Sequence, residues 1–140
     1  WSPGEGERAG IVRYANRGGL DWLPSVGAPF RHLRNATHEQ AREVLRSAAV
    51  VLASGRCAVE AMACGAPVVI CDDRAYQGPL LHQGVMMDAM QRNYSGRGGV
   101  KPTPEAVKDA ITHAQRVGTF RWHVEAYHDV RRIAGELLKL

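Results

Sequence analysis

The sequence predicts an α/β domain with a parallel sheet, and three observations lead to that fold class. Two short runs of apolar residues, 50–53 and 68–71, have the composition of strands that are covered on both faces. The segment between them, 57–64, is typical of a helix, and Gly65 follows it as a natural stop. A helix between two such strands forms a βαβ unit, which requires parallel strands and a right-handed crossover.

The amino-terminal third predicts two further strands. Residues 1–9, rich in Gly and Glu, are expected to form a flexible lead-in to one domain over 10–140. Residues 10–15 predict a short strand, which is followed by a turn over 16–19. A helix that precedes Pro24 has to be short, because proline restricts the residue before it. Residues 30–33 predict a weaker strand.

Helices dominate the predictions for the remaining segments. Thr37 and Gln40 have the spacing of a capping box, and apolar residues then recur at helical spacing up to Ala48. Thr103 and Pro104 indicate the start of another helix. The other expectations are an irregular stretch after Asp73 that contains Gly78 and Pro79, a methionine-rich helix over 80–92, a loop over 93–103, and helices over 104–117 and 119–140.

Length and composition are typical of a single globular domain and argue against a membrane-spanning or disulfide-rich protein. The 140 residues match the size of one domain, and 45% hydrophobic with 23% charged residues is ordinary for a globular protein. No apolar run approaches the roughly 20 residues of a membrane span. The amino terminus is polar from its second residue, which predicts no signal peptide. The three cysteines fit no C-x-x-C pattern, and the histidines have no metal-ligand spacing, so we expect no disulfide or metal site and a cytoplasmic, reducing setting.

Arginine dominates the basic residues, with 15 arginines against three lysines and a net charge of +4. The arginine fork suits phosphate and carboxylate groups. Because the basic residues are spread along the chain, we expect an anionic small ligand rather than a nucleic acid. A surface that is merely rich in arginine remains the alternative interpretation.

The turn between residues 53 and 58 carries the chemistry. In a parallel sheet, such a turn lies in the binding crevice, where the free N–H groups and positive end of the following helix favour a phosphate. Gly55 allows close approach of a ligand, and Arg56 adds a positive charge. Glu60 lies about one helical turn further on. Its carboxylate suits sugar or ribose hydroxyls, so the pattern indicates a nucleotide sugar.

The sequence Glu60-Ala-Met-Ala-Cys-Gly-Ala-Pro-Val-Val69 resembles the EAMAxGxPVV signature of retaining glycosyltransferases with the GT-B fold, above all glycosyltransferase family 4. The resemblance covers residues 30–140, and its specific part is 50–71. It implies a Rossmann-like three-layer α/β/α domain, one half of a GT-B fold. It further implies that the chain is the donor-binding piece of a longer enzyme, preceded by a second domain.

The resemblance also implies roles for individual residues. Glu60 matches the second Glu of the E-x7-E motif, which binds the donor ribose, while the first position of that motif is Leu52. Ser54, Gly55, Arg56 and Cys57 match the helix start that holds the diphosphate. Arg13 and Arg17 are candidates for the basic pair of the family, and Arg97 lies in a glycine-rich loop as a further candidate anion contact.

The implied activity is transfer of a sugar from a nucleoside diphosphate to an acceptor that the sequence does not identify. No metal or other cofactor is expected, because helix-end N–H groups and arginine would stabilise the leaving group. The full enzyme is expected in the cytoplasm, free or at the inner membrane surface. Two alternatives stay open: a sugar-nucleotide 2-epimerase of the same architecture, which the Ser-Gly turn resembles, and a non-catalytic α/β interaction module.

Overall fold

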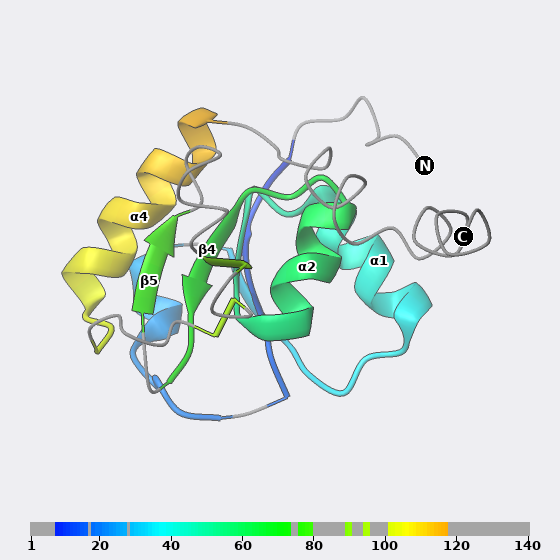
Figure 1. The fold of residues 1–140 in the computed structure, drawn as a ribbon, viewed down its shortest axis with the longest axis horizontal. Coiled ribbons are helices and arrows are strands. Elements are labelled where there is room, and N and C mark those ends of the chain that lie inside the picture. The colour runs from blue at the N-terminus through cyan, green and yellow to red at the C-terminus, as the bar shows by residue number, and fades with distance from the viewer. Residues whose placement is uncertain are drawn as a thin grey trace, which may run out of the picture.

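The fold was obtained as a computed structural model, which describes residues 8–16, 18–27, 29–73, 76–79, 89–90, 94–95 and 101–117. Labelled as in Figure 1, its elements in chain order are β1 (Ile11–Tyr14), the 3-10 helix η1 (Leu23–Val26), β2 (Phe30–Leu33), α1 (His38–Ser47), β3 (Val50–Ala53), α2 (Gly55–Ala63), β4 (Val68–Cys71), β5 (Tyr76–Pro79) and α4 (Pro104–Val117).

The five strands form one sheet in the order β2-β1-β3-β4-β5. Strands β2, β1, β3 and β4 pair in parallel, and β5 runs antiparallel to β4. The predicted βαβ unit is therefore present as β3-α2-β4. The structure confirms the α/β class with a four-stranded parallel region, which is consistent with a Rossmann-like fold.

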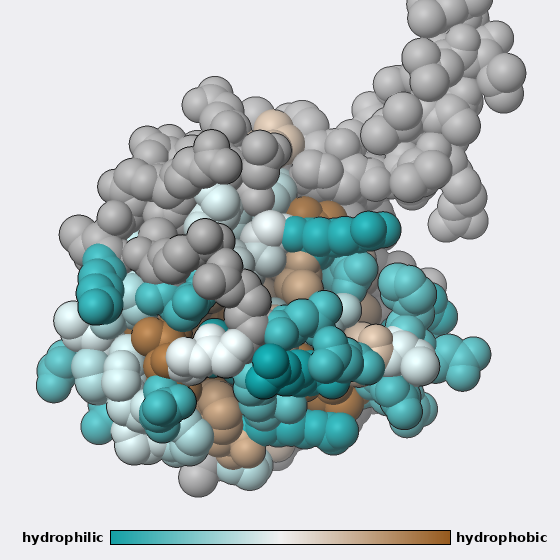
Figure 2. All heavy atoms as spheres, turned by 90° about the horizontal axis from the view of Figure 1, so that it is seen from below, coloured by the Kyte–Doolittle hydropathy of each residue, from teal (hydrophilic) through white to brown (hydrophobic). Residues whose placement is uncertain are grey.

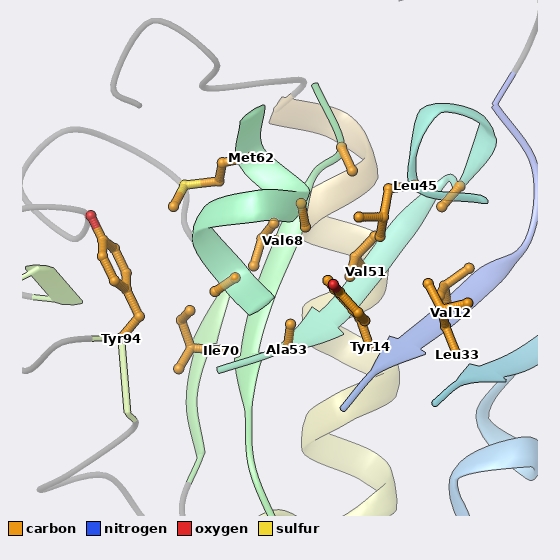
Figure 3. Packing of buried hydrophobic residues seen from close by; sticks show 14 of the residues in the cluster. Val12, Tyr14, Leu33, Leu45, Val51, Ala53, Met62, Val68, Ile70 and Tyr94 are labelled. Carbon is orange, nitrogen blue, oxygen red and sulfur yellow. The ribbon is translucent and has the colours of Figure 1, made fainter. Parts of the chain in front are cut away.

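Side chains of the central strands alternate between two buried clusters, one on each face of the sheet. Val51 and Ala53 of β3 pack with residues of α1 and α2, as Figure 3 shows for the larger members of that cluster. Val50 and Leu52 belong to the second cluster, together with residues of η1 and α4. Figure 1 accordingly shows α1 and α2 on one side of the sheet and α4 on the other. This two-sided burial explains why β3 is apolar at every position.

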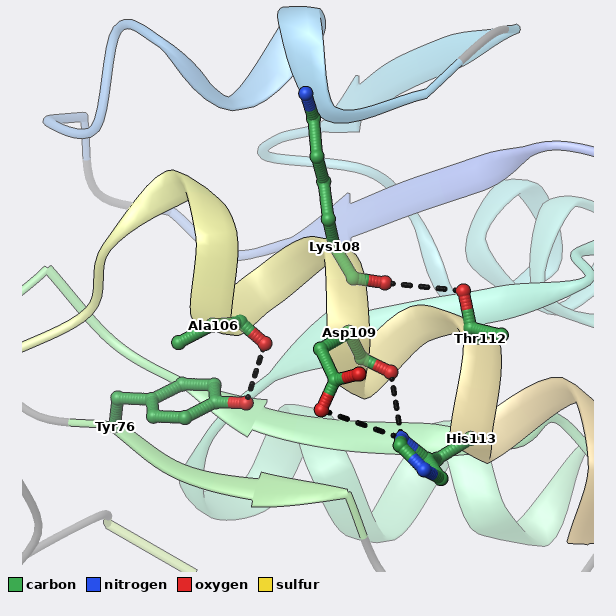
Figure 4. Close-up of polar contacts among 6 residues, drawn as sticks. All are labelled: Tyr76, Ala106, Lys108, Asp109, Thr112 and His113. Atoms are coloured by element: carbon green, nitrogen blue, oxygen red, sulfur yellow. Dashed lines mark hydrogen bonds and ion pairs between the residues drawn. The ribbon is translucent and has the colours of Figure 1, made fainter.

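The antiparallel strand β5 corrects the expectation of an irregular stretch after Asp73. Gly78 and Pro79 are poor strand residues, but such residues are tolerated in an edge strand, where few ladder hydrogen bonds are lost. The hydroxyl of Tyr76 donates to the carbonyl oxygen of Ala106 at 3.1 Å and so ties β5 to α4 (Figure 4). A local sequence pattern does not contain this contact, because the two residues lie 30 positions apart.

Two element boundaries also differ from the predictions. Helix α2 begins at Gly55, two residues before the predicted start, and the expected short helix before Pro24 is a 3-10 turn with Pro24 inside its first turn. Proline is acceptable there because its missing N–H has no helical partner at that position. Gly65 has φ +77°, the left-handed conformation that makes it the predicted stop of α2.

The last two residues of the expected lead-in are bonded to the domain. The Ala9 N–H donates to the carbonyl oxygen of Ser47 at 2.8 Å, and Arg8 donates to three carbonyl oxygens. Residues 1–7, the predicted helix over 119–140, and most of the predicted helix over 80–92 and loop over 93–103 lie outside the described residues.

The capping box at the start of α1 is formed as predicted. Gln40 N–H donates to Thr37 Oγ1 at 3.2 Å, and the Thr37 N–H donates to Gln40 Oε1 at 3.0 Å. We expect Thr37→Ala to lower the free energy of unfolding by about 1 kcal/mol, because it leaves a helix N–H without its acceptor. Urea denaturation measures this change. Thr112→Ala in the middle of α4, where the hydroxyl only donates to the Lys108 carbonyl (Figure 4), is the control and is expected to be nearly neutral. Equal losses in the two variants would contradict the capping interpretation.

Candidate functional site

The candidate site lies where the chain reverses its direction of travel across the sheet. From β1 the chain moves outward to β2, whereas from β3 it moves the opposite way to β4. The carboxyl ends of β1 and β3 therefore frame a topological switch point, the place where open parallel sheets bind ligands. Figure 2 looks onto this edge of the molecule and shows hydrophilic side chains gathered over its centre.

A pocket of about 200 Å³ occupies the switch point. Residues at or just after the carboxyl ends of β1, β3 and β4, together with one residue of α2, line it: Arg13, Tyr14, Ala15, Asn16, Ser54, Cys57, Cys71, Asp72 and Asp73. A larger pocket of about 380 Å³ lies at the opposite edge, next to the amino ends of β1 and β2. The smaller pocket is the better candidate, because at the carboxyl edge helix α2 directs its free N–H groups toward the crevice.

Among the described residues, the amino terminus of α2 has no side-chain cap. Ser54 occupies the capping position, but its hydroxyl donates to Asp72 Oδ2 at 3.0 Å and makes no bond to the helix. The Gly55 N–H donates to the carbonyl oxygen of Tyr94 at 2.7 Å. Within the described part of the chain, the N–H groups of Arg56 and Cys57 have no acceptor. Two backbone donors at the positive end of a helix are thus available to an anion.

Gly55 is needed at this turn for its backbone conformation. Its φ of +58° lies in the left-handed region, which strongly favours glycine over residues with a Cβ. From the sequence, Gly55 was expected to allow close approach of a ligand. The structure adds that the turn from β3 into α2 requires it.

Glu60 lies one turn into α2 and is held from two sides. The Tyr14 hydroxyl donates to Glu60 Oε2, and the Arg56 Nε lies 3.7 Å from Glu60 Oε1. The Glu60 side chain is 29% exposed, whereas that of Arg56 is 89% exposed, so Tyr14 is the partner that fixes the carboxylate. Glu60 lines a second pocket of about 160 Å³ between α1 and α2. The Tyr14–Glu60 hydrogen bond therefore joins residues that line two different pockets.

The titratable groups beside Glu60 stay protonated at neutral pH. Burial, followed by the hydrogen bond to Glu60, raises the pKa of Tyr14 well above its usual value. Burial and the Glu60 charge likewise raise the pKa of the Cys57 thiol, against a smaller opposing effect of Arg56. Cys57 is therefore a neutral thiol at the helix start and not an activated nucleophile.

Of the three arginines predicted as anion contacts, the structure describes only Arg13. The Arg13 side chain is buried, and its two terminal nitrogens donate to the carbonyl oxygens of Gly19 at 2.5 Å and Gly18 at 2.8 Å. Arg13 lines the switch-point pocket, but these hydrogen bonds use its guanidinium to fix the loop that follows β1. Arg17 and Arg97 lie outside the described residues.

Two residues of the site, Tyr14 and Asp72, are not among the predicted site residues. Tyr14 lies within the predicted strand over 10–15, and Asp72 directly follows the apolar run 68–71. In the structure, the Asp72 carboxylate accepts a hydrogen bond from the Ser54 hydroxyl, which makes no bond to the helix. One sequence signal points to both: each lies at or next to the carboxyl end of a predicted parallel strand. Such ends meet at a single edge of the sheet.

Comparisons with family models, curated proteins and solved structures found no match to this chain. Among the residues that the structure describes, no helix is both long and apolar enough to cross a membrane. The same part of the chain contains no group of three or more His, Cys, Asp or Glu side chains arranged to hold a metal ion.

Proposed function

We propose that this chain is the donor-binding domain of a glycosyltransferase and binds a nucleoside-diphosphate sugar at the switch point. One observation carries the proposal: at the start of α2, two backbone N–H groups that have no acceptor among the described residues lie one helical turn from Glu60, at the carboxyl edge of a parallel sheet. The resemblance of residues 60–69 to the family signature supports it independently of the geometry.

Each part of the ligand has a chemical counterpart in the proposed site. The diphosphate lies on the Arg56 and Cys57 N–H groups, with the exposed Arg56 guanidinium free to swing onto it. The ribose donates hydroxyl hydrogens to Glu60. The carboxylates of Asp72 and Asp73 line the same pocket and would repel phosphate, so the sugar, which has hydroxyl donors, is the part that suits their side.

In the proposed reaction, the bond between the anomeric carbon of the sugar and the diphosphate oxygen breaks, and the nucleoside diphosphate leaves. The acceptor hydroxyl oxygen bonds to that carbon and releases its proton to the solvent. The helix-end N–H groups and Arg56 stabilise the negative charge that develops on the leaving diphosphate. We further propose that the complete domain is a three-layer Rossmann-like half of a GT-B enzyme. The acceptor would then come mainly from a second domain, amino-terminal to this one.

Calorimetric titration of the chain with UDP, GDP and ADP tests the proposal. We expect one of them to bind, and Glu60→Ala to weaken that binding by about tenfold or more, because a charged hydrogen bond to the ribose is lost. Glu43→Ala, which removes an exposed glutamate from α1, is the matched control and should bind like the original chain. Failure of all three nucleotides to bind would argue for the non-catalytic interaction module instead.

A further inference from the structure

The Tyr14 hydroxyl at the switch point donates a hydrogen bond to the Glu60 carboxylate on α2. The Tyr14 ring is buried in the cluster shared with α1 and α2 (Figure 3). Tyr14 lines the pocket at the ends of β1 and β3, and Glu60 lines the neighbouring pocket between α1 and α2. Their hydrogen bond thus joins a residue that lines one pocket to a residue that lines the other.

The direction of this hydrogen bond determines what the pair offers to a ligand. A carboxylate only accepts, so the phenol must donate its single hydrogen to Glu60. The Tyr14 oxygen then has lone pairs left to accept a hydrogen bond. Among the described residues, the exposed Arg56 is the one partner of Glu60 Oε1. Two acceptor oxygens therefore lie side by side, and no further hydrogen-bond donor contacts them within the described residues.

Two adjacent acceptors match two adjacent hydroxyl donors. Resting on the proposed function, we propose that Tyr14 and Glu60 act as one diol-recognition pair: Tyr14 fixes the Glu60 carboxylate and also accepts one ribose hydroxyl, so that the site selects ribonucleotides over 2′-deoxyribonucleotides. Tyr14 is then a specificity-determining residue on β1, a strand that the sequence signature around Glu60 does not include.

The test compares UDP, GDP and ADP with their 2′-deoxy forms by calorimetry. For the nucleotide that binds most tightly, we expect the ribose form to bind at least about tenfold more tightly than the deoxy form, because a site built around a hydroxyl discriminates against its absence. Tyr14→Phe keeps the ring and removes only the hydroxyl. It is expected to weaken the ribose form by about tenfold and to reduce the preference to less than about threefold.

Tyr76→Phe is the matched control, since it removes a tyrosine hydroxyl that bonds to the Ala106 carbonyl on the far side of the sheet. It should leave the ribose preference unchanged. A Tyr14→Phe variant that binds ribose and deoxy forms in the original ratio would overturn the diol pair, and so would an original chain that binds nucleotides without preferring ribose. In both cases the proposed donor site would stand. If no nucleotide binds at all, the proposed function fails and the diol pair fails with it.

Discussion

Leu52→Glu is expected to lower the free energy of unfolding by more than about 4 kcal/mol, enough to unfold a marginally stable domain. Position 52 is where the family resemblance would place the first glutamate of the E-x7-E motif. In the structure, Leu52 is 0% exposed and belongs to the cluster between the sheet and α4. A carboxylate at this position would be buried among apolar side chains instead of facing the crevice.

The only charged side chain in register with Leu52 on a neighbouring strand is Arg13. Both terminal nitrogens of Arg13 already donate to the carbonyls of Gly18 and Gly19. An ion pair with the introduced carboxylate would break these bonds, so Arg13 offers little compensation.

Urea denaturation of three variants separates the causes of the loss. Leu52→Met conserves volume and is expected to cost less than about 1.5 kcal/mol, while Leu52→Ala is expected to cost about 3 kcal/mol for the cavity alone. The excess of Leu52→Glu over Leu52→Ala measures the buried charge. If Leu52→Glu were as stable as Leu52→Met, position 52 would face solvent or the crevice, and the burial described above would be wrong.

Arg8→Met is expected to lower the free energy of unfolding by about 3 kcal/mol, because a charged donor that serves three carbonyls is lost. Arg8 donates to the carbonyl oxygens of Leu45 and Ala48 at the end of α1, at 3.1 and 3.2 Å, and to that of Cys64 at the end of α2, at 3.0 Å. Helix ends present carbonyls without partners and a partial negative charge, so one guanidinium stabilises both helices.

Thermal and urea denaturation measure this loss, and two further variants define its origin. Arg8→Lys keeps the charge but lacks the planar fork, so it should recover part of the stability. Arg31→Met removes an exposed arginine from the edge strand β2 and should change the free energy of unfolding by less than about 0.5 kcal/mol. If Arg8→Met were no worse than Arg31→Met, the guanidinium would not hold the two helix ends together.

The local sequence pattern predicts most of the central fold. The apolar runs at 50–53 and 68–71, the capping box at Thr37 and the stop at Gly65 all act over a few residues, and the structure has each of them. Strand β5 was missed because local propensity argues against Gly78 and Pro79, whereas pairing with β4 and the Tyr76 bond to α4 outweigh it.

In the candidate site, too, the local sequence predicts some features and contacts between distant residues decide others. The spacing of Ser54, Gly55 and Glu60 indicates an anion site at a helix start, because those residues are neighbours along one strand-turn-helix segment. The opening of that helix start depends on Asp72, 18 residues from Ser54, and the orientation of Glu60 depends on Tyr14, 46 residues away. Arg13 was expected at an anion but is engaged by the loop that follows its own strand.

The sequence by itself determined the parallel βαβ unit and the turn between its first strand and its helix. It also determined the residue types that a nucleotide sugar would need at that turn. Periodicity and spacing indicate these features because they act along the chain. The tertiary structure decided which side chains meet at the switch point: the Tyr14–Glu60 pair, the Ser54–Asp72 bond and the burial of Leu52. The physical reason is that hydrogen bonds and burial depend on distance in space. Parallel strands bring together residues whose separation in sequence carries no local signal.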